Sequence, residues 1–180
     1  MSDHISEPAQ RPMIVTAWIE PDDLAIFNRL RQRLFPAHLN KLTAHLTLFH
    51  HIPAAERQSF IRAAKSYAAT EEPMQANVLA PFSLGRGVAY QIDCQSLNKL
   101  RSQLRNDYLA HLTPQDSVAK KRLHITVQNK VSGAEAKRTL DGLLSTHESR
   151  ELGIRGLQFY RYDGGPWTWL DACTFGDGRR

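Results

Sequence analysis

Several features are missing from this 180-residue sequence, and each absence excludes a class of protein. No run of about 18 apolar residues occurs, which excludes a transmembrane helix. The first residues lack the basic start and apolar core of a secretory signal, so we expect a cytoplasmic protein. Only Cys94 and Cys173 are present, and neither belongs to a Cys-x-x-Cys pair. We therefore expect two reduced thiols, without a disulfide framework or a cysteine-based metal site.

Motifs of several common enzyme classes are absent as well. The sequence has neither a phosphate-binding P-loop nor a Gly-x-Ser-x-Gly elbow, which argues against a P-loop triphosphatase and a serine hydrolase. One group of histidines has no accompanying carboxylate, so we predict neither a metal site nor a cofactor. That group comprises His38, His45, His50 and His51. The net charge of +5 favours a phosphorylated or polyanionic partner only weakly.

Hydrophobic patterning predicts alternating strands and helices along the chain. The expected strands are 13–19, 45–52, 74–84, 88–94, 123–131, 154–162 and 167–175. Apolar residues at helical spacing predict helices at 24–35, 54–69 and 97–108, and a fourth helix after Ser132-Gly133. Turn residues at 85–87 and 163–166 are expected to join the strands on either side of them.

The two halves of the chain resemble each other in the order of their elements. Each half has a strand, a helix, a strand with His-x-Thr, a second helix and a further strand. His45 and His124 lie 79 residues apart, which indicates duplication of a whole lobe. We expect an α+β fold of two pseudo-twofold β-α-β-α-β lobes, with antiparallel-rich sheets lining a central cleft and helices outside. A flexible lead-in at 1–12 would precede one bilobal domain at 13–180, with halves of about 13–86 and 87–180.

Each strand that carries His-x-Thr has one polar and one mostly apolar face if its side chains alternate. A buried row of polar groups would need many hydrogen-bond partners, so each polar face is expected to line a cleft. The polar faces consist of His45, Thr47, Phe49 and His51 in the first strand, and of His124, Thr126, Gln128 and Lys130 in the second.

Two imidazoles on opposite sides of one cleft can catalyse in-line displacement at phosphorus. One ring takes a proton from the attacking hydroxyl, and the other protonates the leaving oxygen. Imidazole suits both steps because its pKa lies near neutrality. Thr47 and Thr126, about 7 Å along each strand from their histidine, can donate hydrogen bonds to the non-bridging oxygens. We predict that His45, Thr47, His124 and Thr126 are catalytic, and this scheme requires no metal ion.

Five further residues are predicted to contact the substrate. Phe49 is a candidate for stacking on a base, with packing in the core as the alternative. His51 and Lys130, each six residues after a motif histidine, could contact phosphate or merely end a strand. Gln128 shares the polar face of the second strand. Arg122 ends a basic run of three residues before the second motif. This run could steer the phosphate of the substrate, or it could be an ordinary solvated loop.

The segments HLTLFHH at 45–51 and RLHITVQNK at 122–130 resemble the paired signatures of the 2H phosphoesterase superfamily. The similarity is to its bacterial 2′-5′ RNA ligase and RNA 2′,3′-cyclic phosphodiesterase (LigT-like) group, and it extends over about 13–175. It implies metal-free hydrolysis, or reversible ligation, at RNA ends or nucleotide 2′,3′-cyclic phosphates. It also implies that His45 is the acid and His124 the base. Many relatives carry an arginine where this chain has Gln128-Asn129-Lys130, and Lys130 lacks the bidentate fork of arginine.

Two other functions are compatible with the same residues. A non-catalytic RNA or nucleotide binder would keep the cleft without turnover, although the intact His and Thr of both motifs favour an enzyme. An enzyme of this type could also act on a small nucleotide cyclic phosphate instead of RNA, and the modest charge does not separate these substrates. No obligate protein partner is implied, and we expect a monomer.

Overall fold

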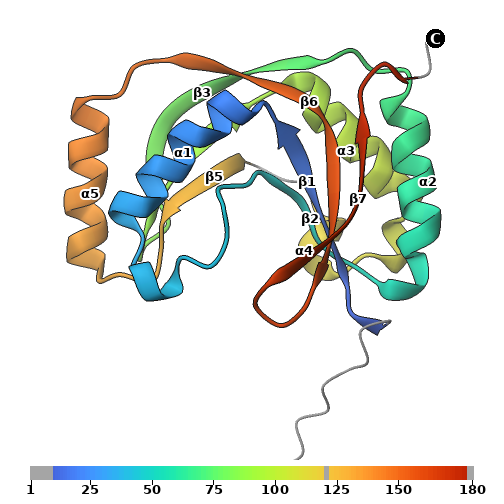
Figure 1. Ribbon diagram of the computed structural model, residues 1–180, viewed down its shortest axis with the longest axis horizontal. Helices are drawn as coiled ribbons and strands as arrows, with labels where there is room; N and C mark the ends of the chain where they lie inside the picture. Colours follow the sequence, from blue (N-terminus) through green and yellow to red (C-terminus); the bar gives the residue numbers. More distant parts are fainter. Residues whose placement is uncertain (1–9, 120–121, 178–180) are drawn as a thin grey trace, which may run out of the picture.

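The computed structural model describes residues 10–119 and 122–177, and seven strands within them form a single curled sheet (Figure 1). All the pairings between these strands are antiparallel. The strands are β1 (Met13–Ile19), β2 (Thr47–Ile52), β3 (Met74–Ser83), β4 (Val88–Asp93), β5 (Leu123–Gln128), β6 (Arg150–Tyr162) and β7 (Trp167–Thr174). Most of the predicted lead-in (residues 1–9) and two residues of the basic run (120–121) lie outside the described residues.

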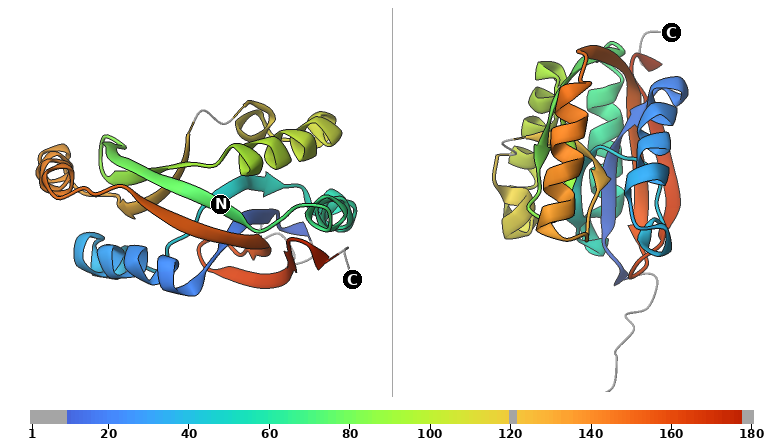
Figure 2. Two further views of the ribbon diagram at one scale, coloured as in Figure 1. Left: turned by 90° about the horizontal axis from the view of Figure 1, so that it is seen from above. Right: turned by 90° about the vertical axis from the view of Figure 1, so that its left-hand side faces the viewer.

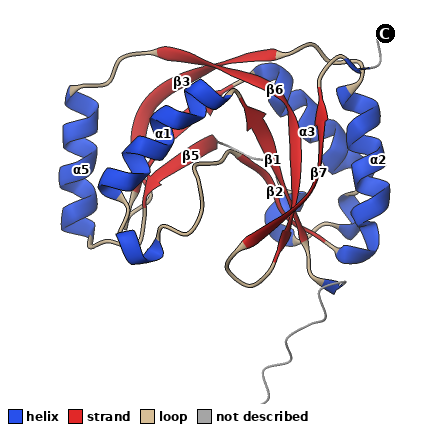
Figure 3. Cartoon of the chain, viewed as in Figure 1, coloured by secondary structure: helices blue, strands red, loops and turns tan. Residues whose placement is uncertain are grey.

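Helices flank the sheet at both ends of the molecule. They are α1 (Pro21–Leu34), α2 (Arg57–Ala68), α3 (Gln95–Asp107), α4 (Pro114–Ser117) and α5 (Gly133–Ser145), with short 3-10 turns at Ala37–Leu39, Ala54–Glu56 and Leu109–His111. Helices α1 and α5 lie toward one end, and α2 and α3 lie toward the other (Figures 2 and 3). The one-turn helix α4 was not predicted. In the described part of the chain, no helix combines the length and the apolar character needed to span a bilayer.

Local sequence explains where helices α1 and α5 begin. Helix α1 opens with Pro21, whose missing N–H is not needed in the first turn. Asp22 and Asp23 follow at the positive end of the helix dipole, and basic residues occupy the last turn. Helix α5 begins after Ser132, whose side chain accepts a hydrogen bond from the backbone N–H of Glu135.

The strand order confirms the internal duplication. Along the sheet it is β2-β1-β6-β3-β4-β5, with β7 paired to β6 outside this path. The order is symmetric when β1 is exchanged with β4, β2 with β5 and β3 with β6, as a pseudo-twofold relation requires. The third strand of each half pairs with the other half, because β3 lies beside β4 and β6 lies beside β1. The two lobes therefore share one continuous sheet.

The sheet curls until its two outermost strands, β2 and β5, touch. Leu46, directly before β2, forms an isolated antiparallel bridge with Ile125 of β5. Both side chains are fully buried and belong to the main apolar core. Burial of each such side chain contributes roughly 1.5–3 kcal/mol to stability. The core thus holds together two segments that lie far apart in the sequence, and both of them carry a His-x-Thr triplet.

Candidate active site

The bridge between the two motif strands fixes how the motifs face each other. In an antiparallel bridge the flanking residues are also opposite one another, so His45 lies across from Thr126 and Thr47 lies across from His124. Because side chains alternate along a strand, all four point away from the buried face of the bridge. The four residues predicted to be catalytic are therefore gathered on one surface.

Both histidine rings are held in the same way. Nδ1 of His45 lies 2.8 Å from the carbonyl oxygen of Thr43, and Nδ1 of His124 lies 3.1 Å from that of Arg122. A carbonyl oxygen can only accept a hydrogen bond, so each Nδ1 carries a proton. Nε2 is therefore the basic nitrogen of each neutral ring, and it is the atom that can accept a proton from a reactant.

An aromatic ring lies beside each histidine. The ring of Trp167, the first residue of β7, has its centroid 4.6 Å from that of His45. Phe82 of β3 meets His124 edge-on at 5.8 Å, and the guanidinium of Arg122 lies 5.0 Å from the centre of the Phe82 ring. Sequence reasoning missed the place of Trp167 at this site, because a tryptophan beside a hairpin turn usually pairs across the two strands.

The electrostatic setting of His45 keeps its ring neutral. Burial lowers the pKa of His45 to about 4, from an ordinary value of 6.5. The hydrogen bond to the carbonyl of Thr43 opposes this shift of the pKa, whereas the positive charges of Arg31, His50 and His124 add to it. In the unliganded protein His45 is therefore a neutral base at pH 7.

Among the pockets that border the paired motifs, two contain a motif histidine together with several other cationic side chains. The pocket on the His45 side has a volume of about 480 Å³ and is lined by residues that include Arg31, Lys41, His45, Thr126, Lys130 and Trp167. The pocket on the His124 side has a volume of about 620 Å³ and is lined by residues that include His50, Arg122 and His124. This charge suits an anionic substrate held between the two histidines.

The predicted contacts Lys130 and Arg122 each line one of these pockets. Lys130 has a φ of 61°, and it is the only non-glycine residue with positive φ in the described ranges. Its backbone N–H donates to the side chain of Asn129 at 2.8 Å. The left-handed conformation costs a lysine roughly 1–2 kcal/mol. Strain of this kind is often retained at functional sites, and here it directs Lys130 into the pocket that contains His45.

A β-bulge follows the threonine of the first motif, and it overturns one predicted contact. Two adjacent residues of β1 pair with Thr47 and Phe49, so Leu48 is an extra residue in β2. An extra residue reverses the alternation of side chains beyond it. Phe49 therefore points into the core, where it is 0% exposed and packs edge-on against Phe60 at 5.2 Å. The prediction that Phe49 stacks on a base is wrong.

A second bulge occupies the matching position in the other motif strand. Two adjacent residues of β4 pair with Thr126 and Gln128, so Val127 is the extra residue in β5. Gln128 is consequently 1% exposed, and its amide donates to the hydroxyl of Thr139 in α5 at 3.0 Å. The prediction that Gln128 contacts the substrate is wrong for the same reason as that for Phe49.

A further irregularity in β2 exchanges the positions expected for its two adjacent histidines. From the pair Val15–Phe49 to the pair Met13–Ile52, β2 advances by three residues and β1 by two. β2 therefore has one further extra residue in this stretch. His50, expected on the opposite face, lines the pocket that contains His124. His51 is exposed and lines neither pocket beside the motifs. The structure therefore places His50, and not His51, in a pocket beside the paired motifs, so the face predicted for each of these histidines is wrong, while a contact with phosphate stays a prediction.

Two buried arginines cross between the halves of the chain and hold the bulged strands. Arg31 of α1 donates from Nη1 to the carbonyl of Thr126 at 2.9 Å, and from Nε and Nη2 to Oδ1 of Asn40 at 3.1 and 2.9 Å. Arg101 of α3 donates from Nε to the carbonyl of Leu48 at 2.9 Å. Each arginine thus satisfies a carbonyl at the bulge in the other half's motif strand.

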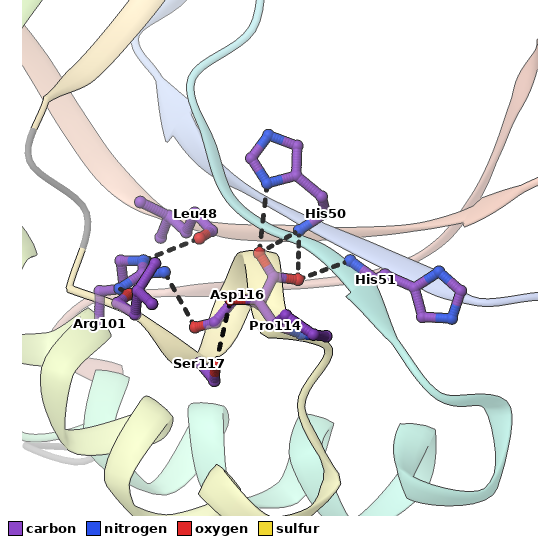
Figure 4. Close-up of polar contacts among 8 residues, drawn as sticks. Leu48, His50, His51, Arg101, Pro114, Asp116 and Ser117 are labelled. Carbon is purple, nitrogen blue, oxygen red and sulfur yellow. Dashed lines mark hydrogen bonds and ion pairs between the residues drawn. The ribbon is translucent and has the colours of Figure 1, made fainter.

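A buried carboxylate closes the outer edge of β2 around Arg101 (Figure 4). Asp116 of α4 accepts hydrogen bonds from the backbone N–H groups of His50 and His51, both at 2.8 Å. Arg101 donates to the backbone carbonyl of Asp116 at 3.2 Å. Burial by itself raises the pKa of Asp116, but the hydrogen bonds from His50 and His51 bring it below its ordinary value. The carboxylate supplies partners to amides that an edge strand would leave unpaired.

The sequence does carry a signal for both arginines. Residues 27–34 read FNRLRQRL and residues 97–104 read LNKLRSQL, with apolar residues at the first, fourth and eighth positions. Arg31 and Arg101 each occupy the fifth position, which lies within the apolar stripe of a helix. A charged residue at such a position predicts a buried partner, and the repetition of the pattern supports the internal duplication.

A curled antiparallel sheet that brings two His-x-Thr strands together defines a two-histidine phosphoesterase architecture. The family model described as the 2′-5′ RNA ligase superfamily matches residues 19–166. The chain belongs to this superfamily, as the motif segments suggested, and this membership supports phosphoesterase-type activity. No curated protein gives a match to the sequence.

Solved structures share the fold over nearly the whole chain. TT0787 of Thermus thermophilus superposes with a TM-score of 0.65 at 16% identity, covering 94% of this chain and 100% of that one. E. coli LigT complexed with NADP+ gives a TM-score of 0.62 at 14% identity, with 93% and 99% coverage. LigT complexed with 3′-AMP gives 0.58 at 12% identity, with 92% and 98% coverage. At these identities the similarity establishes the fold.

Proposed function

We propose that the protein hydrolyses 2′,3′-cyclic phosphates of RNA ends or nucleotides by two-histidine acid–base catalysis, and that the same site supports reversible 2′-5′ ligation when a 5′-hydroxyl replaces water as the nucleophile. The observation that carries this proposal is the antiparallel pairing of the two His-x-Thr triplets, with both Nδ1 atoms bonded to carbonyls. The complexes of E. coli LigT with NADP+ and 3′-AMP support a nucleotide as ligand of the same fold.

The proposed reaction needs one proton acceptor and one proton donor. Nε2 of one histidine takes a proton from water while the water oxygen attacks phosphorus. The other histidine gives its proton to the ring oxygen that leaves, so one P–O bond forms and one breaks. The product is a phosphomonoester beside a free hydroxyl. Thr47 and Thr126 donate hydrogen bonds to the non-bridging oxygens as their negative charge grows.

The low pKa of His45 supports roles opposite to those implied by the resemblance. An acid must start the reaction protonated, whereas His45 is neutral above a pKa of about 4. We therefore assign the base to His45 and the acid to His124. With this assignment, kcat/KM should decline on the acidic side only as the pH falls through about 4, where His45 gains a proton and can no longer act as the base.

A substrate with a good leaving group separates the two roles independently of pH. A nucleoside p-nitrophenyl phosphodiester releases p-nitrophenolate, which needs little protonation. We expect His124→Ala to lose orders of magnitude on a 2′,3′-cyclic phosphate but much less on the aryl ester. His45→Ala should lose activity on both substrates, because the attacking water still requires its base. The reverse pattern would make His45 the acid.

A substrate panel tests the proposed activity itself. Wild type is assayed with 2′,3′-cyclic, 2′-5′-linked and 3′-5′-linked substrates, and the cyclic phosphate should react fastest. His45→Ala and His124→Ala should each be slower by roughly 10²–10⁴-fold, with EDTA having no effect on wild type. His111→Ala, which changes a histidine outside both pockets, is the matched control. Full activity in either motif variant, or loss of activity with EDTA, would contradict the proposed mechanism. Binding of RNA without turnover would favour the non-catalytic alternative.

A further inference from the structure

A separate pocket lies on the far side of α1 from the paired motifs. It has a volume of about 260 Å³ and shares no lining residue with the two pockets beside the histidines. It is formed by α1, by β3 and β4, and by the connection from α5 into β6. Its floor contains Phe27, Val78 and Tyr90, and its rim contains Arg29, Arg33, His147, Glu148 and Arg150.

Three arginines line this pocket, against one acidic residue, Glu148. Arg29 and Arg33 are one helical turn apart, so they project from the same face of α1. Arg150 joins them from the start of β6. Burial raises the pKa of the Tyr90 hydroxyl, and the charges of Arg150 and Arg33 oppose that rise, as expected for cations close to it. The pocket is therefore positively charged, with a hydroxyl group among its cations.

Aromatic rings form part of the same pocket. Tyr90 and His147 lie with their centroids 6.0 Å apart and tilted by 44°, and Phe27 meets Tyr90 edge-on at 5.8 Å. The half-buried ring of His147, packed against Tyr90, offers a surface on which any base can stack, and guanidinium groups bind phosphate through paired hydrogen bonds. The combination of an aromatic floor and an arginine rim matches a nucleotide better than a purely apolar ligand.

Helix α1 lies between this pocket and the pocket that contains Arg31 and His45. Arg31 lies between Arg29 and Arg33 in sequence, but it lines the pocket that contains His45. Residues two apart on a helix project about 200° from each other, so the two pockets lie on opposite sides of α1. A helix with its side chains is roughly 10–12 Å across, which a short single strand can span.

We propose that this pocket is a second nucleotide subsite, which holds a base and a phosphate of an RNA strand upstream of its 2′,3′-cyclic phosphate end. The proposal rests on the proposed cyclic phosphodiesterase activity and adds a substrate class to it. An RNA end reaches both pockets, whereas a mononucleotide reaches only the paired histidines. The subsite therefore makes RNA ends the preferred substrates.

The experiment compares one nucleoside 2′,3′-cyclic phosphate with a six-nucleotide RNA that ends in the same group. Wild type should have a kcat/KM at least tenfold higher for the RNA. The double variant Arg33→Ala/Arg150→Ala should lose this advantage, mainly through KM, and keep its rate on the mononucleotide. The control Arg62→Ala/Arg138→Ala removes the same charge from exposed helix positions outside the pocket, and it should behave as wild type.

A binding measurement keeps this inference distinct from the proposed activity. Fluorescence anisotropy with a labelled RNA ending in a 3′-phosphate requires no turnover. The slope of log affinity against log salt should decrease by about 0.7 for each phosphate that the double variant no longer neutralises. If wild type hydrolyses neither substrate, the proposed activity fails while binding still measures the subsite. Unchanged RNA binding in the double variant, or equal losses of kcat/KM on both substrates, would overturn the subsite.

Discussion

The motif segments of the two halves, which run into β2 and through β5, are built from the same parts. In each, a histidine is held through Nδ1 by the carbonyl two residues before it, and a bulge follows the threonine. In each, an arginine from the other half's helix bonds to a carbonyl at the bulge. The duplication has thus preserved the backbone geometry that presents the two triplets to each other.

The partners of the two arginines differ. Arg101 lies beside Asp116, and although burial lowers the pKa of Arg101, the charge of Asp116 opposes this. Burial also lowers the pKa of Arg31, but its partners are the neutral oxygens of Asn40 and Thr126. Among the described residues, neither arginine forms an ion pair with a carboxylate, but the charge of Asp116 acts on Arg101, whereas burial alone shifts the pKa of Arg31. Each arginine lines a pocket beside a motif histidine. We infer that the charge of Arg101 is offset by Asp116 and serves the fold, whereas Arg31 holds a positive charge ready for the phosphate of the substrate.

The largest expected effect comes from replacing Arg31. Arg31→Met removes the buried charge that lines the pocket with His45, and we expect kcat/KM for a nucleoside 2′,3′-cyclic phosphate to fall by roughly 10²–10³-fold. Arg101→Met should leave kcat/KM within about threefold of wild type in the folded protein, because Asp116 already balances that charge. Steady-state kinetics of both variants measures the two values of kcat/KM. Equal losses of kcat/KM would contradict the distinction between the two arginines.

The same two variants should differ in the opposite sense in stability. Arg101→Met leaves the carbonyls of Leu48, Asp116 and Val118 without this donor. At about 1 kcal/mol for each acceptor left without its donor, the free energy of unfolding should decrease by roughly 3 kcal/mol. Arg31→Met also removes three hydrogen bonds, but two of them share Oδ1 of Asn40, so only two acceptors lose their donor and the cost should be smaller. Urea denaturation at pH 7 measures both values, and a greater loss for Arg31→Met would contradict the assignment.

Asn40→Asp places a carboxylate beside Arg31, as Asp116 lies beside Arg101. The new carboxylate would pair with Arg31, so we expect kcat/KM to fall about tenfold (about 1.4 kcal/mol) without loss of stability. Gln32→Glu introduces the same charge at an exposed position of α1 and serves as the control. Activity of Asn40→Asp at the wild-type level would show that the charge of Arg31 does not act on the substrate.

Asp116→Asn tests whether the carboxylate of Asp116 stabilises the fold. The test is the pH dependence of the free energy of unfolding. Because the pKa of Asp116 lies below its ordinary value of 3.8, its ionised form stabilises the fold above that value. This stability is lost as the pH falls through the pKa of the folded state. We expect the variant to be less stable than wild type by about 1 kcal/mol at pH 7, with the difference shrinking below pH 4. Chemical denaturation at both pH values measures it, and a constant difference would contradict the role of the carboxylate.

Much of the fold could be predicted because its signals are local. Apolar runs and turn residues indicated the order of strands and helices, and the spacing of His45 and His124 indicated the duplication. Thr47 and Thr126 were placed correctly because only one residue separates each from its histidine. Over so short a distance, strand alternation holds.

The errors arise where long-range pairing decides the geometry. Phe49 and Gln128 were assigned to the wrong face because a bulge depends on which residues of the neighbouring strand pair, and the motif strand does not contain that information. Asp116 was missed because it lies in a single helical turn. Arg31 and Arg101 were missed because arginines on helices are usually solvated, although their repeated place in the apolar stripe indicated burial.

The central claim is that His45 and His124 act together in one step. The most direct measurement is kcat/KM for a nucleoside 2′,3′-cyclic phosphate in His45→Ala, in His124→Ala and in the double variant. Groups that act as a unit give strongly non-additive effects, so we predict that the double variant is about as slow as the slower single variant. If the two losses multiply in the double variant, the histidines act independently, and the account of a paired acid and base is contradicted.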